Sequence, residues 1–470
     1  MLMRVFLPSV GIGRFAGGAA LAFLLSGPVF AQQTGVTGTM PEDLMPGLRP
    51  LIENGLKQAP DMIAKDINIS IAEAQRLYNG YAPMLPGVSS NAQYGEYETA
   101  IANNAQATSR SLGTFYQVAI SQPVFHWGAL RNQLQMQKIA VLLSEKDFAL
   151  GYLTFANSMR RQYEALIIAR IALRNEQLSL KMRQKALDLA NVELKAGTIP
   201  QSALNAAQLD FDSSQLAFDK DTQAYDFARR AFARQAGVGE LPGDSVPEGI
   251  PLPKYAAAAS SALVAGLLQT GAQNTIQVQQ GRLQVAQSVL QYKNARLGLM
   301  PNFSAGASIQ EWNQSNVQNG AVTQTALTSE QVALRVDWTI FDGFQTRGRT
   351  REALLRRRQA ERQLDQTTDQ ILSDAQNSRR SVDLAWRQLQ VTERQFAISN
   401  YSNIQQQSEL KLGNISQDAA DHSQYVYNAG EIDDASARNG FLSSWCDFLS
   451  VVGADPVMNQ IPASYARAKP

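Results

Sequence analysis

Residues 330–347 read EQVALRVDWTIFDGFQTR, and this stretch decides the fold of the chain. Apolar side chains alternate there with small or charged ones, which is the pattern of a β-strand with one apolar face and one polar face. Phe341, Asp342 and Gly343 follow the strand, and a proline-free sequence of helical pattern continues from them for about seventy residues. A strand of this kind suits the wall of a membrane barrel, which has lipid on one side and water on the other.

The same junction occurs once more in the first half of the chain, which indicates an internal duplication. Phe125 aligns with Phe341 and Gly197 aligns with Gly413, each pair being 216 positions apart. Each half is predicted to hold two strands, a long helix, a Gly-x-Ile turn and a second helix. Because the spacing is kept from strand to turn, the two long helices are expected to have the same length.

The chain is expected to divide into six segments. Residues 1–31 have the basic start, short apolar core and small-residue cleavage site of a secretory signal peptide. The further segments are a mobile N-terminal arm at 32–60, a first repeat at 61–240, a linker at 241–254, a second repeat at 255–453 and a disordered tail at 454–470. The expected strands are residues 88–98, 112–125, 302–312 and 331–341, with a polar loop inside each pair.

Composition narrows the class of protein. The chain has 42 basic and 41 acidic residues, so its net charge indicates neither a nucleic-acid partner nor an acidic substrate. The one cysteine, Cys446, can form no intrachain disulfide, so an exported chain of this length must be stabilised by packing. After residue 31 no apolar run is long enough for a membrane-spanning helix, so insertion into a membrane would require strands.

The first long helix carries an apolar residue every seven positions, which is the spacing of a coiled-coil seam. At 1.5 Å per residue such a helix is roughly 100 Å long, more than one globular core needs. An ordinary two-helix coiled coil remains the alternative for this helix alone. The seam residues are Tyr152, Met159, Leu166, Leu173, Leu180, Leu187 and Leu194, and their aligned partners in the second half are more polar.

Four strands are too few to close a membrane barrel, since the smallest such barrels have about eight. An open strand edge cannot lie in hydrocarbon, because its backbone groups would find no hydrogen-bond partners. If the strands lie in a membrane, several copies of the chain must therefore combine them.

Two strand–helix–turn–helix units behind a signal peptide resemble the TolC family of outer-membrane efflux proteins. The resemblance covers nearly all of residues 61–452 and is carried by the doubled order, by residues 295–301 before a strand, by QPVF at 122–125, by TIFDG at 339–343 and by the two Gly-x-Ile turns. It implies a mainly α fold with membrane β-strands. The protein would be a homotrimer whose twelve strands form one β-barrel in the outer membrane of a Gram-negative bacterium. An α-barrel would continue this barrel across the periplasm, and an inner-membrane pump and a periplasmic adaptor protein would dock at its tip.

The resemblance also implies candidate sites. Asp418 and Asp421 fall on the acidic positions of the periplasmic entrance, where carboxylates from three copies would form a ring, favour cations and raise one another's pKa. Their first-repeat counterparts are Ser202 and Asn205, and no basic latch is evident near Gly413. Alternatively, the two aspartates only solvate the start of a helix. The expected docking tips are Gly197, Thr198, Ile199, Gly413, Asn414 and Ile415, and the expected membrane girdle is Tyr94, Tyr97, Tyr116, Trp312 and Trp338.

Other motifs point to no enzyme. The sequence has no nucleophile elbow, phosphate loop or HExxH pattern, and His126 and His422 lack the neighbours of a metal site, so no cofactor or metal is expected. An arginine-rich run at 347–362 lacks the interleaved aromatic residues of a nucleic-acid site. It could meet lipid phosphates, line a tunnel or simply solvate a helix. The predicted function is a passive outer-membrane channel that exports small molecules. The alternatives are a conduit for type I protein secretion and a soluble periplasmic coiled-coil scaffold.

Overall fold

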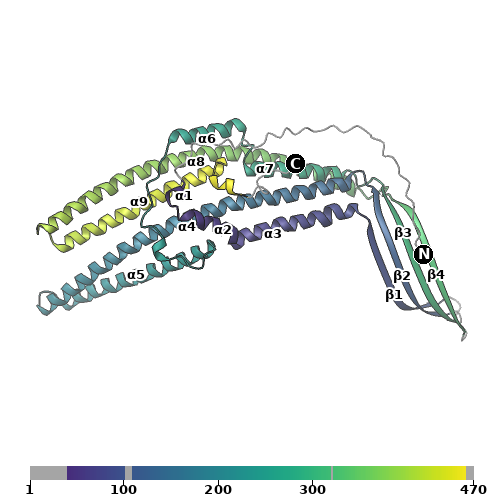
Figure 1. The fold of residues 1–470 in the computed structure, drawn as a ribbon, viewed down its shortest axis with the longest axis horizontal. Coiled ribbons are helices and arrows are strands. Elements are labelled where there is room, and N and C mark those ends of the chain that lie inside the picture. Colours follow the sequence, from purple (N-terminus) through teal and green to yellow (C-terminus); the bar gives the residue numbers. More distant parts are fainter. Residues whose placement is uncertain (1–39, 101–107, 319–320, 462–470) are drawn as a thin grey trace. The chain divides into compact units, whose positions relative to one another are not determined.

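The computed structural model describes residues 40–100, 108–318 and 321–461, which all belong to one compact unit, residues 37–470 (Figure 1). The predicted signal peptide lies outside the described residues. The helices are α1 (Pro41–Leu44), α2 (Leu48–Gln58), α3 (Pro60–Gln75), α4 (Ala129–Lys195), α5 (Gln201–Gln235), α6 (Ala257–Thr270), α7 (Ile276–Ala295), α8 (Gln345–Lys411) and α9 (Gln417–Val452). The strands are β1 (Gly87–Ala100), β2 (Thr108–Phe125), β3 (Asn302–Gln318) and β4 (Ala321–Asp337). Short helical turns are η1 (Arg76–Tyr81), η2 (Ala82–Met84), η3 (Gly243–Ser245) and η4 (Pro456–Gln460).

The predicted duplication is confirmed in the lengths of the helices. Both α4 and α8 have 67 residues, and each is followed by a turn and a second helix that folds back along it. In Figure 1 the two turns lie at one end of the helices and the sheet lies at the other. α7 packs against both α4 and α8, so it joins the two repeats next to the sheet.

The four strands form one antiparallel sheet in the order β1-β2-β3-β4. The prediction of a polar loop at 313–329 was wrong, because β3 continues to Gln318 and β4 begins at Ala321. Residues 313–329 are rich in Thr, Ser, Gln and Asn. They pair through their backbones, and because their side chains do not alternate between apolar and polar, the sequence does not predict a strand there. The prediction also extended the last strand to residue 341, whereas β4 ends at Asp337.

The two faces of the sheet differ in chemistry. Successive residues of a strand point to opposite faces, and directly paired residues share a face, so the register assigns each residue to one of them. We call them the apolar face and the polar face. The apolar face carries Val88, Val118, Ile120, Ile309, Val332, Leu334 and Val336, together with three carboxylates, Glu96, Glu311 and Glu330. The polar face carries Asn91, Gln117, Ser308, Gln310, Ser329 and Gln331. The large apolar side chains of the first face are exposed in the single chain.

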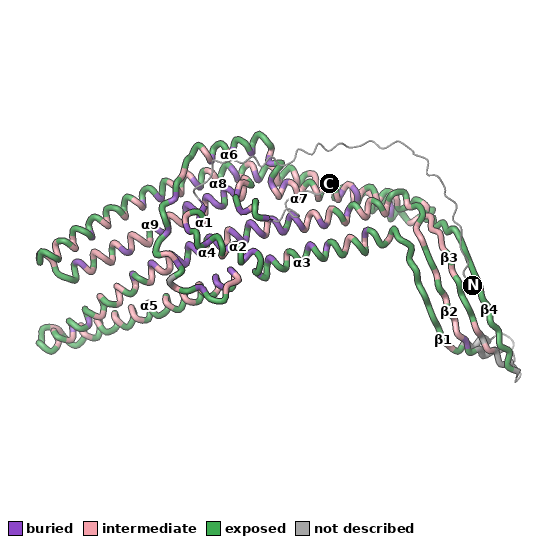
Figure 2. The backbone as a smooth tube through the Cα atoms, viewed as in Figure 1, coloured by how far each residue is buried: buried purple, intermediate pink, exposed green. Residues whose placement is uncertain are grey.

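The core lies in the middle of the helices. Figure 2 shows the buried residues gathered along α4, α8 and the end of α9, while the strands are exposed or intermediate. The predicted seam of α4 is buried at Tyr152, Met159, Leu166 and Leu187, and the aligned seam of α8 is buried at Ala375, Val382, Leu389 and Asn403. The seams therefore pack each long helix against its neighbours over most of its length.

Two predicted flexible segments are ordered where the structure describes them. In the arm predicted at 32–60, α2 buries Leu48 and Ile52, and in the tail predicted at 454–470, η4 buries Val457. The reason is a buried ion-pair cluster. Arg160 of α4 donates to Glu42, 118 residues earlier, and to Asp455, 295 residues later, at 2.6 to 3.0 Å. Residues 32–39 and 462–470 lie outside the described part of the chain.

Candidate functional site

The two helix–helix turns have the same backbone geometry. Gly197 and Gly413 take left-handed φ angles of 70° and 77°, which glycine adopts without steric cost. After each glycine the next backbone N–H donates 3.0 Å to the carbonyl five residues earlier, at Glu193 in the first turn and at Glu409 in the second. This is the Schellman ending of a helix, and it reverses the chain within a few residues.

The predicted docking tips form the ends of these turns. Gly197, Thr198, Gly413 and Asn414 are exposed. The two isoleucines of the tips, Ile199 and Ile415, are half-buried. Both turns therefore present backbone and polar groups to solvent, and the second turn also exposes Leu412 by 72%.

The two predicted entrance carboxylates have different surroundings. Asp418 is exposed in the first turn of α9. Asp421 is half-buried; it forms an ion pair with Lys185 of α4 and accepts a hydrogen bond of 2.8 Å from Gln417. In the first repeat, Asn205 accepts the equivalent bond of 3.0 Å from Gln201, without a charge. The acidic site therefore exists in one repeat only.

The ion pair sets the ionisation of both partners. Burial opposes the charge on Asp421, but hydrogen bonds from Lys185 and Gln417 outweigh it, so the pKa of Asp421 lies below its ordinary value. The hydrogen bond to Asp421 raises the pKa of Lys185. Within a single copy the pKa of Asp421 thus shifts in the direction opposite to that expected for a ring of carboxylates.

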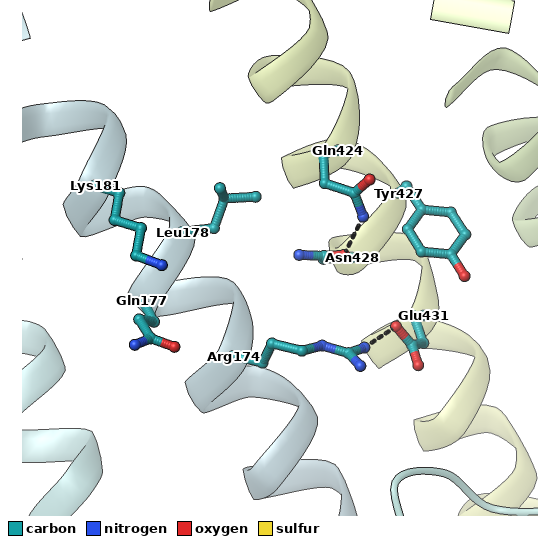
Figure 3. A pocket seen from close by; sticks show the side chains of 8 residues that line it. All are labelled: Arg174, Gln177, Leu178, Lys181, Gln424, Tyr427, Asn428 and Glu431. Carbon is teal, nitrogen blue, oxygen red and sulfur yellow. Dashed lines mark hydrogen bonds and ion pairs between the residues drawn. The ribbon is translucent and has the colours of Figure 1, made fainter. Parts of the chain in front are cut away.

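A polar cavity of about 350 Å³ lies between α4 and α9, next to this ion pair along the helices. Figure 3 shows Arg174 of α4 reaching Glu431 of α9, and the two residues form an ion pair. Burial raises the pKa of Glu431, and Arg174 opposes that shift. The cavity is lined by Arg174, Gln177, Leu178, Lys181, Gln424, Tyr427, Asn428 and Glu431.

The α9 side of this cavity is backed by amide side chains. Asn403 of α8 donates 2.9 Å to Gln424, and Gln424 donates 2.9 Å to Asn428. Asn403 and Asn428 are both buried. The contact between α4 and the α8–α9 pair is therefore made by polar groups and ion pairs near the turns, and partly exposed pairs of this kind contribute only about 0–1 kcal/mol each.

Sequence reasoning missed Lys185, Arg174 and Glu431. Lys185 lies in the first repeat and Asp421 in the second, and the aligned position of Lys185 in the second repeat is Tyr401. The pair therefore has no repeated pattern. Only the packing of α9 against α4 brings its two members together.

The expected girdle residues lie on both faces of the sheet. Tyr94 and Tyr116 lie on the apolar face and are exposed. Trp312 lies on the polar face. Trp338 follows β4 and donates 3.1 Å to the carbonyl of Leu299. Tyr97 is in β1, and its side chain lies outside the described residues.

The arginine-rich start of α8 consists partly of local ion pairs. Arg356 pairs with Glu352, Arg357 with Glu361 and Arg362 with Asp365. Spacings of three or four residues place these partners on one helix surface. Three arginines of the run therefore have carboxylate partners within the same helix.

The described residues contain neither a membrane-spanning helix nor a metal-binding cluster. None of the helices in the described ranges is both long and apolar enough to cross a membrane. The same residues hold no cluster of three His, Cys, Asp or Glu side chains placed for a metal ion.

Comparison with known proteins identifies the fold. Residues 51–238, which contain β1, β2, α4 and nearly all of the first repeat, match the family model described as "Outer membrane efflux protein". No curated protein matches the chain by sequence.

Solved structures match over most of the chain. The outer membrane protein VceC of Vibrio cholerae has 14% identity and a TM-score of 0.61, with 88% of this chain and 99% of VceC covered. The CmeC outer membrane channel of Campylobacter jejuni has 14% identity and a TM-score of 0.61, with 98% of both chains covered. The MtrE outer membrane channel of Neisseria gonorrhoeae, in its open state, has 16% identity and a TM-score of 0.62, with 87% of this chain and 89% of MtrE covered.

These matches confirm the resemblance that the doubled strand–helix order predicted. Residues 51–238 match the model of the outer membrane efflux protein family, and the described chain has the fold of outer-membrane channels.

Proposed function

We propose that the chain is a passive outer-membrane channel that carries small molecules from a tripartite efflux pump to the exterior. The observation that carries the proposal is the sheet, which has one apolar face, one polar face and two open edges. An exposed apolar face fits lipid, and a polar face fits a water-filled lumen. The family of residues 51–238 and the channel fold support the same function.

The open edges require partner strands. Among the described strands, β1 and β4 each pair on one side only. In hydrocarbon the unpaired backbone groups would cost several kcal/mol each, so a membrane sheet must close on itself. Three copies supply twelve strands, enough for one barrel. β1 and β4 run in opposite directions, so pairing β1 of one copy with β4 of the next continues the antiparallel order.

Apolar residues next to the open edges support this trimer. The segment before β1 exposes Leu77, Tyr78 and Leu85 by 60%, 59% and 61%, and the segment after β4 exposes Ile340 and Phe341 by 76% and 70%. Both segments lie at the helical end of the sheet. If β1 of one copy pairs with β4 of the next, these two segments meet and bury one another.

The entrance would lie at the two turns. Asp418 and Asp421 from three copies would place six carboxylates there and favour cations. The ion pair between Lys185 and Asp421 would act as the latch, because it ties α9 to α4 within each copy. The six tip residues, 197–199 and 413–415, would offer the docking surface for the adaptor and the pump.

Neither alternative function is favoured. A soluble coiled-coil scaffold has no use for a sheet with an exposed apolar face and two open edges. A conduit for protein secretion would need the same sheet, but the matched family is described by efflux.

The test is reconstitution of the full chain. We expect the purified protein to need detergent, to have the mass of a trimer by light scattering and to conduct ions in planar lipid bilayers. Leu77→Lys should reduce the trimer, whereas Leu77→Met, which keeps the contact apolar, should not. A water-soluble monomer without conductance would refute the proposal.

A further inference from the structure

One row of the polar face is apolar in three of its four strands, its β1 member being Gln93. Phe115 of β2 pairs with Trp312 of β3, and Trp312 pairs with Leu327 of β4, so the three side chains lie side by side across the sheet. The rings of Phe115 and Trp312 touch edge to face, with centroids 5.9 Å apart and planes at 74°. We call Phe115, Trp312 and Leu327 the aromatic row.

The rest of the polar face isolates this row. Toward the helices, the neighbouring row on the same face consists of Asn91, Gln117, Gln310 and Ser329, which are all uncharged and polar. On the other side, the neighbouring row consists of Gly95, Gly113, Gln314 and Thr325, so only the part beside Phe115 lacks side chains. The aromatic row is therefore an apolar shelf with uncharged polar residues on one side and with glycine backbone beside Phe115 on the other.

Packing within the chain does not account for the row. Leu327 is 63% exposed and Trp312 is 40% exposed, so neither is buried by its neighbours. Aromatic side chains carry a large apolar surface whose exposure to water is unfavourable. Exposed apolar side chains gathered on an otherwise polar surface are typical of binding sites.

The charge around the row selects the kind of ligand. On the described part of the polar face, the charged residues are Arg335 and Asp337, at the helical end of β4. Leu327 is eight positions from Arg335, which is about 27 Å along a strand. An uncharged shelf with amide neighbours matches an uncharged planar solute, whereas a charged solute would lose hydration without gaining a partner.

We propose that the aromatic row is a transient binding shelf for uncharged aromatic solutes inside the channel. The proposal rests on the proposed function, which turns the polar face toward the lumen. Flat rings would stack on Trp312 and Phe115 and hydrogen-bond to the amides of the neighbouring row. Binding of this kind is weak, and a conduit requires that a solute can leave its site.

The first test asks which side of the barrel wall Trp312 faces. The fluorescence of Trp312 is obtained as the difference between the wild-type protein and Trp312→Phe in lipid vesicles. We expect iodide in the water to quench this signal and dibrominated lipid to leave it unchanged. Quenching by the brominated lipid would place the row against lipid and overturn the proposal, even if the protein conducts ions.

The second test measures binding in planar bilayers with caffeine, an uncharged planar solute. Caffeine should add reversible current blocks to the wild-type channel. Combined Phe115→Ser, Trp312→Ser and Leu327→Ser changes should lower the apparent affinity by about fivefold or more, since stacking is lost. Gln331→Ala, one row further from the shelf on the same face, and the conservative Trp312→Phe should keep most of the block.

The outcomes of the second test separate the two proposals. Equal block in the triple variant and the wild type, in channels that conduct, would leave the proposed function intact and remove the shelf. A wild-type protein that inserts but never conducts would remove both. If the triple variant runs on gels as a heat-resistant trimer, its loss of current block does not come from misfolding.

Discussion

Lys185 of α4 and Asp421 of α9 form an ion pair that joins the first repeat to the second close to the two turns. The two helices belong to different helix pairs, α4–α5 and α8–α9, so this contact is one of those that join the pairs. Arg174 and Glu431 form a second ion pair along the same two helices.

Breaking the latch should open the channel. In Lys185→Glu the attraction to Asp421 becomes repulsion, so we expect a higher conductance or open fraction in planar bilayers. Lys185 is exposed and solvent screens its ion pair, so the expected change is severalfold at most. The charge swap of Lys185→Glu with Asp421→Lys should return the conductance toward the wild-type value.

The matched control for this prediction is Arg183→Glu. Arg183 pairs with Asp210 at 3.6 Å, and both residues belong to the α4–α5 pair. Its loss leaves the contact between the repeats in place, so the conductance should not rise. An equal rise in both variants would show that any added negative charge opens the channel.

The latch should persist over most of the pH range. The pKa of Asp421 in the folded chain lies below the ordinary 3.8, so the stabilisation is complete above about pH 4 and is lost as the pH falls through the folded pKa. We therefore expect wild-type conductance to stay constant from about pH 8 to 5 and to rise only in stronger acid. Asp421→Asn should remove this acid response. A rise already near pH 6 would assign the titration to another group.

Glu164 should make the protein less stable as the pH rises. It is 1% exposed and neither carboxylate oxygen has a hydrogen-bond partner in the described structure. Burial raises the pKa of Glu164 to about 8, against the opposing charge of Arg160. Between the ordinary 4.5 and about 8 the folded chain binds more protons than the unfolded chain, so the free energy of unfolding falls with rising pH.

Thermal unfolding in detergent at several pH values checks this expectation. The fall should approach about 1.4 kcal/mol per pH unit inside that window and should stop above it. Glu164→Gln cannot ionise and should flatten the curve. A wild-type curve as flat as that of the variant would show that water or movement relieves the buried charge.

Removing Arg160 should release both terminal segments from α4. Arg160→Met leaves Glu42 and Asp455 without their partner, and uncompensated buried charges cost about 3–5 kcal/mol. We expect a lower unfolding temperature and protease cleavage within residues 40–58 and 454–461. The control Arg161→Met removes only the exposed ion pair with Asp447, so the free energy of unfolding should fall by no more than about 1 kcal/mol.

The long helices and their turns could be predicted from the sequence because their signals are local. Gly197 and Gly413 each end a proline-free helical pattern, and the constant spacing to Phe125 and Phe341 gave equal helix lengths, now seen as 67 residues each. The lengths of β3 and β4 could not be predicted, because their polar ends pair through backbone groups that carry no side-chain pattern.

Contacts between distant segments were beyond sequence reasoning. The latch partner Lys185 has no aligned basic counterpart, and Arg160 finds its partners 118 and 295 residues away. Trp312 looked like a girdle residue because its sequence position lies in a strand, but only the register shows which face it occupies. A single sequence carries no information on such pairings.

The cluster around Arg160 has a consequence for biogenesis. Glu42 is synthesised before Arg160, but Asp455 follows Arg160 by 295 residues, so a nascent chain holds only one of the two carboxylates of the cluster. The late arrival of the second carboxylate leaves the cluster incomplete until the last segment of the described chain has been made.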